Sequence, residues 1–280
     1  MYFGAGALGQ PREHHASLPS TNDRALAWAR EGAPHGAMVT ADAQTAGRGR
    51  LGRRWDSPPG AGLYVSLVLR PAQVLAGRGW DPRWAALGLA VGLGLRDGLA
   101  RWVPDVLLKW PNDLLVRGDK LAGVLCETRW QGSTPDVVVG FGVNVAQREF
   151  PAELRATSLA REMAGRTCPE GQTKLTEGAC PGGQADLSDK TSPGREEVLA
   201  AALAGLGPAL RAFFAGGFPA IRARYERHSA VLGRALTVGG AAAEAVGFDD
   251  DGALRVRAPG GGPSRRVESE DVWIRGPGEA

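Results

Sequence analysis

Residues 47–55 read Gly47-Arg48-Gly49-Arg50-Leu51-Gly52-Arg53-Arg54-Trp55, and we call this segment the arginine loop. Its four arginines repel one another, and its glycines let a ligand approach the backbone closely. We therefore expect a loop that stays disordered until an anion condenses on it, which suits a phosphate-bearing ligand. Trp55 adds a flat face for a nucleobase. Composition alone fits a solvated surface loop or an RNA-binding patch equally well.

A second cluster, Lys109-Trp110-Pro111-Asn112-Asp113, is followed by Lys120-Leu121-Ala122-Gly123. Lysine is scarce here, with four among 33 basic residues, and two of the four flank this predicted turn. Ammonium, carboxylate and amide groups at adjoining strand ends are what a nucleoside triphosphate with Mg²⁺ requires. An ordinary polar hairpin is the alternative. A third cluster, Gly140-Phe141-Gly142-Val143-Asn144, closes a buried-strand pattern and by itself indicates core packing.

The chain has 280 residues, of which 43% are hydrophobic and 22% charged, which predicts a folded protein with a sizeable core. A net charge of +3 does not by itself imply nucleic acid. Three cysteines without a C-x-x-C pair argue against a disulfide framework or a zinc ribbon, so a reducing cytoplasm is the default. The most apolar stretch, residues 84–95, is too short to cross a bilayer, and no secretory signal is visible. Two G-x-G-x-x-G matches lack the strand and helix that a dinucleotide site needs.

Periodicity predicts alternating strands and helices after an unpatterned lead-in over residues 1–16, where a short strand stays open. Helices are expected over 20–31, 81–102, 199–214 and 218–225, and strands over 37–43, 62–70, 106–110, 120–130, 136–145, 235–238, 244–248, 253–258 and 272–275. The glycine spacing at 88, 92, 94 and 98 predicts close packing of that helix against a sheet. Residues 164–194 are poor in large apolar side chains and read as a mobile, solvated insertion.

Taken in order, Ser20-Thr21-Asn22, the arginine loop, Lys109–Asp113, Lys120–Gly123 and Gly140–Asn144 closely resemble biotin protein ligases. The resemblance covers residues 18–160 and continues more weakly to the C-terminus. It implies an α/β (α+β) fold, with a mixed-sheet catalytic domain over residues 1–231 and a small SH3-like β-barrel over residues 232–280. Some members carry an N-terminal helix-turn-helix and act as repressors. Only 19 residues precede Ser20, so we expect a monofunctional biotin–[acetyl-CoA-carboxylase] ligase that binds no DNA.

The resemblance also implies roles for individual residues. The biotin site is assigned to Ser20, Thr21, Asn22, Gln44, Gly47, Arg48, Gly49, Arg50, Lys120 and Gly123. The ATP and adenylate site is assigned to Arg48, Arg50, Trp55, Lys109, Asn112, Lys120 and Asn144, with Asp113 on Mg²⁺. Catalysis is assigned to Arg48, Arg50, Lys109 and Lys120 as electrostatic stabilisers. Cys126 and Glu127 receive no chemistry.

The implied reaction has two steps. The biotin carboxylate attacks the α-phosphorus of ATP, and a lysine of a biotin carboxyl carrier protein then attacks biotinyl-5'-AMP. The base of the second step is left open between Asp113 and water, and dimerisation is also left open. A lipoate or octanoate ligase is the nearest rival, and a nucleic-acid-binding protein using the arginine loop is the rival from another class. We expect a cytoplasmic protein without a membrane partner.

Overall fold

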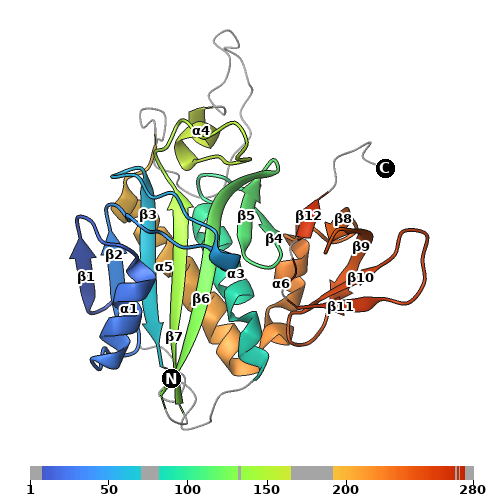
Figure 1. Ribbon diagram of the computed structural model, residues 1–280, viewed down its shortest axis with the longest axis horizontal. Coiled ribbons are helices and arrows are strands. Elements are labelled where there is room, and N and C mark those ends of the chain that lie inside the picture. Colours follow the sequence, from blue (N-terminus) through green and yellow to red (C-terminus); the bar gives the residue numbers. More distant parts are fainter. Residues whose placement is uncertain are drawn as a thin grey trace, which may run out of the picture.

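The computed structural model describes residues 8–70, 82–131, 134–164, 192–268, 270 and 272–274. Two β-sheets lie side by side in Figure 1. The larger sheet contains β1 (Arg12–His15), β2 (Met38–Ala41), β3 (Gly62–Leu69), β4 (Leu107–Lys109), β5 (Asp113–Val116), β6 (Asp119–Gln131) and β7 (Thr134–Asn144). The smaller sheet contains β8 (Ala235–Val238), β9 (Ala241–Phe248), β10 (Leu254–Arg257), β11 (Arg265–Val267) and β12 (Val272–Ile274). The helices are α1 (Thr21–Arg30), α3 (Leu87–Leu99), α4 (Leu159–Ala164), α5 (Arg195–Gly216) and α6 (Arg222–Arg227), with single 3₁₀ turns at Arg50–Gly52, Pro82–Ala86 and Phe218–Ala220.

The larger sheet has the order β1-β2-β3-β7-β6-β5-β4. β1 and β2 are parallel, and every other neighbouring pair in this sheet is antiparallel. The smaller sheet is antiparallel, in the order β11-β10-β9-β8-β12. The predicted α/β class with a mixed sheet is therefore confirmed, and the second sheet is consistent with an SH3-like unit. The domain boundary at residue 231 stays a prediction.

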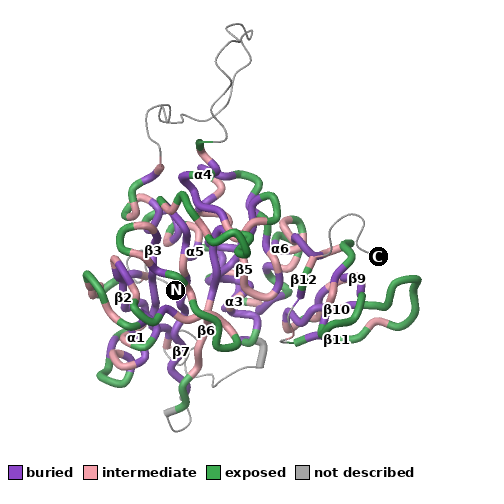
Figure 2. The backbone as a smooth tube through the Cα atoms, turned by 45° about the horizontal axis from the view of Figure 1, so that its top comes forward, coloured by how far each residue is buried: buried purple, intermediate pink, exposed green. Residues whose placement is uncertain are grey.

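Helices cover both faces of the larger sheet (Figure 1). α1 packs on β2, β3 and β7 through a small cluster that includes Ala25, Leu26 and Val68. α3 and α5 cover the other face, where Leu63, Val65, Leu67 and Leu69 of β3 enter the main core, as their alternation predicts. In Figure 2 the buried backbone follows these strands and helices, while exposed stretches gather in the loops.

Glycines of α3 contact a helix as well as the sheet. A Cβ atom at Gly98 would lie 2.3 Å from the carbonyl oxygen of Ala201 on α5, and one at Gly94 would lie 2.7 Å from Leu206 Cα. Gly88 and Gly92 instead face strand side chains, such as Cys126 and Leu108, at ordinary contact distances. The predicted packing against a sheet thus holds for two of the four glycines, and the other two allow α3 and α5 to cross closely.

In the described part of the chain, α5 is the one helix long and apolar enough to cross a membrane. Half of its most apolar window is buried inside the molecule, as is usual for a core helix of a folded protein.

The two sheets share one core. Trp110 Nε1 donates a hydrogen bond to the Gly252 carbonyl oxygen at 3.0 Å. Phe248 of β9 packs edge-on against Phe218 and Tyr225, with ring centroids 5.8 and 5.4 Å apart. These contacts fix the smaller sheet against the β4 end of the larger one.

Three strands differ from the sequence predictions. β1 falls inside the lead-in, where it pairs with β2. The predicted turn is present, since residues 110–112 join β4 to β5 as an antiparallel hairpin. The strand β5, which begins at Asp113, was not predicted, and the chain reverses again at Arg117 and Gly118, both with positive φ. A non-glycine residue in this conformation gives little sequence signal. β11 is short and rich in arginine, so it lacks an apolar pattern. Residues 165–191 of the expected insertion lie outside the described residues.

The crossing of α3 and α5 predicts opposite effects for two glycine substitutions. Gly98→Ala should lower the free energy of unfolding by about 2–3 kcal/mol, because its methyl group meets α5 backbone. A methyl group at Gly88→Ala would make an ordinary contact, 3.8 Å from Cys126 Sγ, so this variant should be neutral or more stable by up to about 1 kcal/mol, because alanine favours helix. Urea unfolding of both variants measures this, and equal stabilities would contradict the close crossing.

His35 predicts a pH dependence of stability. Arg70 N donates to His35 Nδ1 at 3.1 Å, and burial, followed by the charge of Arg70, lowers the pKa of His35 to about 4. The unfolded histidine has a pKa near 6.5 and takes up a proton at higher pH than the folded one. Stability should therefore fall by on the order of 2 kcal/mol as pH drops from about 6.5 to 4.

His35→Asn is the matched variant, since its amide oxygen can still accept from Arg70 N but does not titrate. Its unfolding free energy should change less than that of the wild type across the same pH range. Parallel curves for the two proteins would show that His35 is not the group responsible.

Candidate active site

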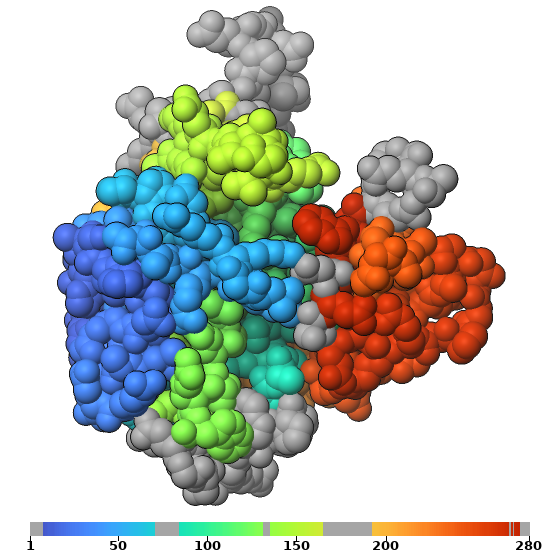
Figure 3. Space-filling model, viewed as in Figure 1, coloured from blue at the N-terminus to red at the C-terminus, as the bar shows by residue number. Residues whose placement is uncertain are grey.

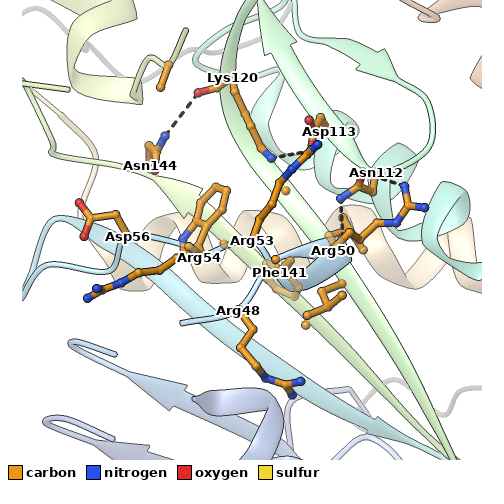
Figure 4. Close-up of a pocket in the computed structure, with 18 of the residues that line it drawn as sticks. Arg48, Arg50, Arg53, Arg54, Asp56, Asn112, Asp113, Lys120, Phe141 and Asn144 are labelled. Atoms are coloured by element: carbon orange, nitrogen blue, oxygen red, sulfur yellow. Dashed lines mark hydrogen bonds and ion pairs between the residues drawn. The ribbon is translucent and has the colours of Figure 1, made fainter. Parts of the chain in front are cut away.

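A cavity of about 280 Å³ lies on the α1 face of the larger sheet. It extends from the N-terminus of α1, under the arginine loop, to β4 and β12. Figure 3 shows the light-blue segment that contains the arginine loop crossing this face towards the red C-terminal strands. Figure 4 shows side chains from the loop and the strands converging there.

The floor of the cavity is bare strand backbone. Gly123 of β6 and Gly142 of β7 are direct partners in the strand register. A Cβ atom at Gly142 would lie 2.6 Å from the Trp55 ring, and one at Gly140 would lie 2.0 Å from Asn22 Oδ1. These glycines are therefore required for Trp55 and Asn22 to lie flat against the sheet.

The closed end of the cavity carries a network of hydrogen bonds. The backbone N–H and the hydroxyl of Thr21 donate to Gln44 Oε1 at 2.8 and 3.1 Å. Gln44 thus caps α1, while the side chain of the N-cap residue Ser20 makes no capping bond. Ser66 Oγ donates to Asn22 Oδ1 at 2.5 Å and lies 2.8 Å from Thr21 Oγ1.

Arg48 is held by carboxylates. Its guanidinium donates to both carboxylate oxygens of Glu127 at 2.9 and 2.6 Å, and it lies 2.7 Å from Asp23 Oδ1. Glu127 also accepts from Asn22 Nδ2 at 2.8 Å. Figure 4 shows Arg48 pointing away from Lys120 and Asp113. Glu127, left without a role in the sequence analysis, therefore joins the arginine loop to α1.

Cys126 packs against the main hydrophobic core. Burial, with a smaller contribution from Glu127, raises the pKa of its thiol to about 12. The thiol is therefore protonated near neutral pH and is no nucleophile.

The arginine loop is an ordered turn, which corrects the expectation of disorder. Gly49 N donates to the Arg53 carbonyl oxygen at 2.7 Å, and Trp55 N donates to the Gly47 carbonyl oxygen at 2.9 Å. A Cβ atom at Gly47 would lie 2.5 Å from the Trp55 carbonyl oxygen, so this close approach needs glycine. Charge repulsion does not open the loop because carboxylates neutralise Arg48 and the backbone bonds close the turn.

Cationic and amide groups gather at the open end. Lys120 Nζ lies 2.6 Å from Asp113 Oδ1 and 5.2 Å from the centre of the Trp55 ring. Asn112 donates to the Val124 carbonyl oxygen at 3.0 Å and accepts from Arg50 at 3.5 Å. The predicted second cluster and the arginine loop thus meet, although they are about 60 residues apart in the chain.

Asn144 anchors the segment that follows β7. Its side-chain amide donates to the carbonyl oxygens of Thr157 at 2.9 Å and Lys120 at 3.3 Å. Residues from Gln147 to Ala156 continue along the cavity wall. This segment has no periodic pattern, and no site residue was predicted in it from the sequence.

Every site residue predicted from the sequence lines the cavity except Gly47. Gly47 instead shapes the arginine loop through its close approach to the Trp55 carbonyl oxygen. The lining set is Ser20, Thr21, Asn22, Gln44, Arg48, Gly49, Arg50, Trp55, Lys109, Asn112, Asp113, Lys120, Gly123 and Asn144. Their individual roles stay predictions. Trp273 of β12 also lines the cavity, and Ser66 and Glu127 support its closed end. Ser66 left a signal, since it interrupts an otherwise apolar strand, whereas Glu127 is followed by Thr128 and Arg129 and left none.

A metal ion would find few protein ligands here. Among the described residues, no group of three or more histidine, cysteine, aspartate or glutamate side chains is placed to hold one. Asp113 and Asn112 offer one carboxylate and one amide near Lys120. Such a donor set fits Mg²⁺ held chiefly by phosphate oxygens and water rather than by a protein cage.

Comparisons with known proteins agree with this geometry. Residues 15–144 match the Biotin/lipoate A/B protein ligase family. The bifunctional ligase/repressor BirA of Bacillus subtilis is 31% identical over 276 residues, covering 95% of this chain and 75% of that protein. The biotin–[acetyl-CoA-carboxylase] ligase of Paracoccus denitrificans is 35% identical over 251 residues, covering 88% and 94%. The biotin protein ligase from Aquifex aeolicus in complex with biotin and ATP superposes with a TM-score of 0.72 and 28% identity, covering 95% of this chain and 99% of that one.

The fold and the site define an α/β ligase with a second, antiparallel sheet. This chain belongs to the Biotin/lipoate A/B protein ligase family, and the resemblance seen in its motifs is confirmed.

The contact between Arg48 and Glu127 predicts how firmly the arginine loop is held. Glu127→Gln replaces a charged hydrogen-bond pair by a weaker neutral one, at a cost of about 1.4 kcal/mol in loop closure. The initial rate of tryptic cleavage after Arg50, Arg53 and Arg54 should therefore rise about tenfold. Mass spectrometry of the fragments measures this rate.

Glu31→Gln is the control, because Glu31 pairs with Arg24 on an exposed surface of α1 away from the loop. This variant should cleave like the wild type. Unchanged cleavage in Glu127→Gln would show that Glu127 does not hold the loop.

Proposed function

We propose that this chain is an ATP-dependent biotin–protein ligase, which forms biotinyl-5'-AMP and transfers biotin to a lysine of a biotin carboxyl carrier protein. The observation that carries the proposal is the shape of the cavity. It has a polar closed end, a bare glycine floor and a cationic open end, so it suits a ligand with a small polar ring, a chain and a negative tail. The Aquifex aeolicus protein, solved with biotin and ATP, supports this assignment.

The closed end would bind the biotin ring. Thr21, Asn22 and Gln44 supply hydroxyl and amide groups there, fixed by Ser66 and by the α1 N-terminus. The hydrocarbon chain would then run past the Trp55 ring, which lies on the glycine floor, towards Lys120. Because the network holds these polar groups in place, little reorganisation is needed when the ring binds.

The open end would carry out the first step. A biotin carboxylate oxygen attacks the α-phosphorus, the bond to the bridging oxygen breaks, and pyrophosphate leaves. Negative charge grows on the phosphoryl and leaving oxygens, so preorganised cations lower the barrier. We assign this role to Arg50, Lys109 and Lys120. Arg48 contributes less, because Glu127 and Asp23 neutralise it.

The proposal includes a Mg²⁺ ion. The carboxylate of Asp113, assisted by Asn112, would hold the ion beside the phosphates. When bound, the ion would offset the charge repulsion between carboxylate and triphosphate. Lys120 pairs with Asp113 at 2.6 Å, so its ammonium lies beside the carboxylate that would hold the ion.

The second step needs a neutral lysine amine, whose free pKa is about 10.4. Asp113 and solvent water are the two candidate bases from the sequence. Asp113 already contacts the Lys120 ammonium at 2.6 Å, and this engagement favours water as the base.

The location and the partners of the enzyme follow the sequence predictions. We propose a cytoplasmic enzyme whose partners are ATP, biotin and the carrier protein. Neither DNA binding nor a membrane partner forms part of the proposal, and dimerisation is left open. Lipoate activation is the competing function, because the matching family includes lipoate ligases.

Pyrophosphate exchange into ATP tests the proposal. Exchange should require both biotin and Mg²⁺, because adenylation is reversible and the metal offsets charge repulsion. Lipoate and octanoate should give only background exchange. Equal exchange with lipoate would overturn the biotin assignment, and full exchange in excess chelator would remove Mg²⁺ from it.

A further inference from the structure

Trp273 is the point where the smaller sheet reaches the cavity. It lies on β12, its register partner is Thr237 of β8, and its side chain is 57% exposed. An exposed tryptophan adds nothing to the core of its own sheet. Its position at the cavity mouth therefore calls for another explanation.

Two cations lie against this indole. Lys109 Nζ of β4 is 5.0 Å from the ring centre, and Arg53 Cζ of the arginine loop is 5.9 Å from it. Both distances are within the range of a cation–π contact. Three segments far apart in the sequence therefore meet at one aromatic ring.

The ring reduces an electrostatic cost. Two positive side chains directed at one site repel each other, and each loses conformational entropy when it is fixed. The negative face of an indole attracts both cations and restricts both side chains. Trp273 thus keeps two positive charges close together at the mouth of the cavity.

The ring is itself firmly placed. Phe248 packs against Phe218 and Tyr225, and Trp110 is hydrogen-bonded to Gly252, so the smaller sheet is fixed beside β4. The Trp110 contact comes from the residue next to Lys109. Strand β4 and the smaller sheet therefore hold Lys109 and Trp273 as one unit.

We propose that Trp273 is a positioning residue for the β- and γ-phosphates of ATP, acting through Lys109 and Arg53. This inference rests on the proposed function. Polyphosphate is the chemistry that two clustered cations at the open end recognise. The smaller sheet thereby becomes part of the ATP site.

Titration calorimetry with inorganic tripolyphosphate, ATP and AMP on the full chain tests the proposal. Trp273→Val removes the π face but keeps a residue that favours strands. Losing two exposed cation–π contacts should weaken tripolyphosphate and ATP about fivefold to thirtyfold. AMP, which lacks the outer phosphates, should bind unchanged. Equal weakening of AMP would mean that Trp273 stacks on the base, and would overturn the proposal.

Two further variants separate positioning from folding. Trp273→Tyr keeps an aromatic face and should restore tripolyphosphate binding to within about threefold of wild type. Trp130→Val is the matched control, since Trp130 is also 57% exposed but lies at the far end of β6. It should bind tripolyphosphate like the wild type. A Trp273→Tyr protein as weak as Trp273→Val would contradict the role of the π face.

A double variant tests whether Trp273 acts through the cations. In a Lys109→Met background, Trp273→Val should weaken tripolyphosphate by a smaller factor than it does in the wild type. In pyrophosphate exchange, Trp273→Val should raise KM for ATP and leave KM for biotin unchanged. If the changes in tripolyphosphate binding free energy from the two substitutions were fully additive, the proposal that Trp273 acts through Lys109 would be overturned.

The two proposals fail in different ways. A wild-type chain without biotin-dependent exchange would contradict the proposed function. A wild type that exchanges normally, with a Trp273→Val variant of unchanged KM for ATP, would contradict only the role of Trp273.

Discussion

The site depends on a strip of strand that carries no side chains. Gly123 of β6 and Gly142 of β7 are register partners, and Gly140 lies two residues before Gly142 on β7. Because the backbone is bare there, Trp55 and Asn22 can lie on the sheet with a cavity between them and the neighbouring elements. Any larger residue at position 140 or 142 would push one of these side chains away. The glycines therefore set the depth of the cavity, and the polar groups around it depend on that depth.

Charge is distributed unevenly around this strip. At the closed end Arg48 is matched by Glu127 and Asp23, so the guanidinium serves to connect elements. At the open end Lys120 lies between one carboxylate and the face of Trp55, and Arg50 reaches Asn112. Cationic side chains from the arginine loop, β4 and β6 therefore gather at the end where phosphates would bind. This separation lets a ligand's neutral end and its anionic end recognise opposite ends of one cavity.

The sequence predicted those parts of the site whose residues are neighbours in the chain. Lys109–Asp113 and the arginine loop were identifiable because clustered charge and glycine have few structural explanations. Strands with strict alternation, such as β3, were also predictable. Glu127 and Trp273 were missed because their partners are set by strand register and by the packing of the two sheets. The order of the arginine loop was missed for the same reason, since the carboxylates that neutralise Arg48 come from α1 and β6.

The arginine loop is anchored at both ends to different parts of the molecule. Arg48 binds β6 through Glu127, and Arg53 lies against Trp273 of the smaller sheet. Between these anchors Leu51 has a φ of 56° and is 64% exposed. A left-handed leucine costs about 1–2 kcal/mol, and an exposed one recovers none of it by burial. The conformation persists because the backbone bond from Gly49 to Arg53 and the two anchored arginines leave the tip no relaxed alternative. The loop therefore connects β6 with the smaller sheet through a strained tip, and its conformation depends on contacts with both.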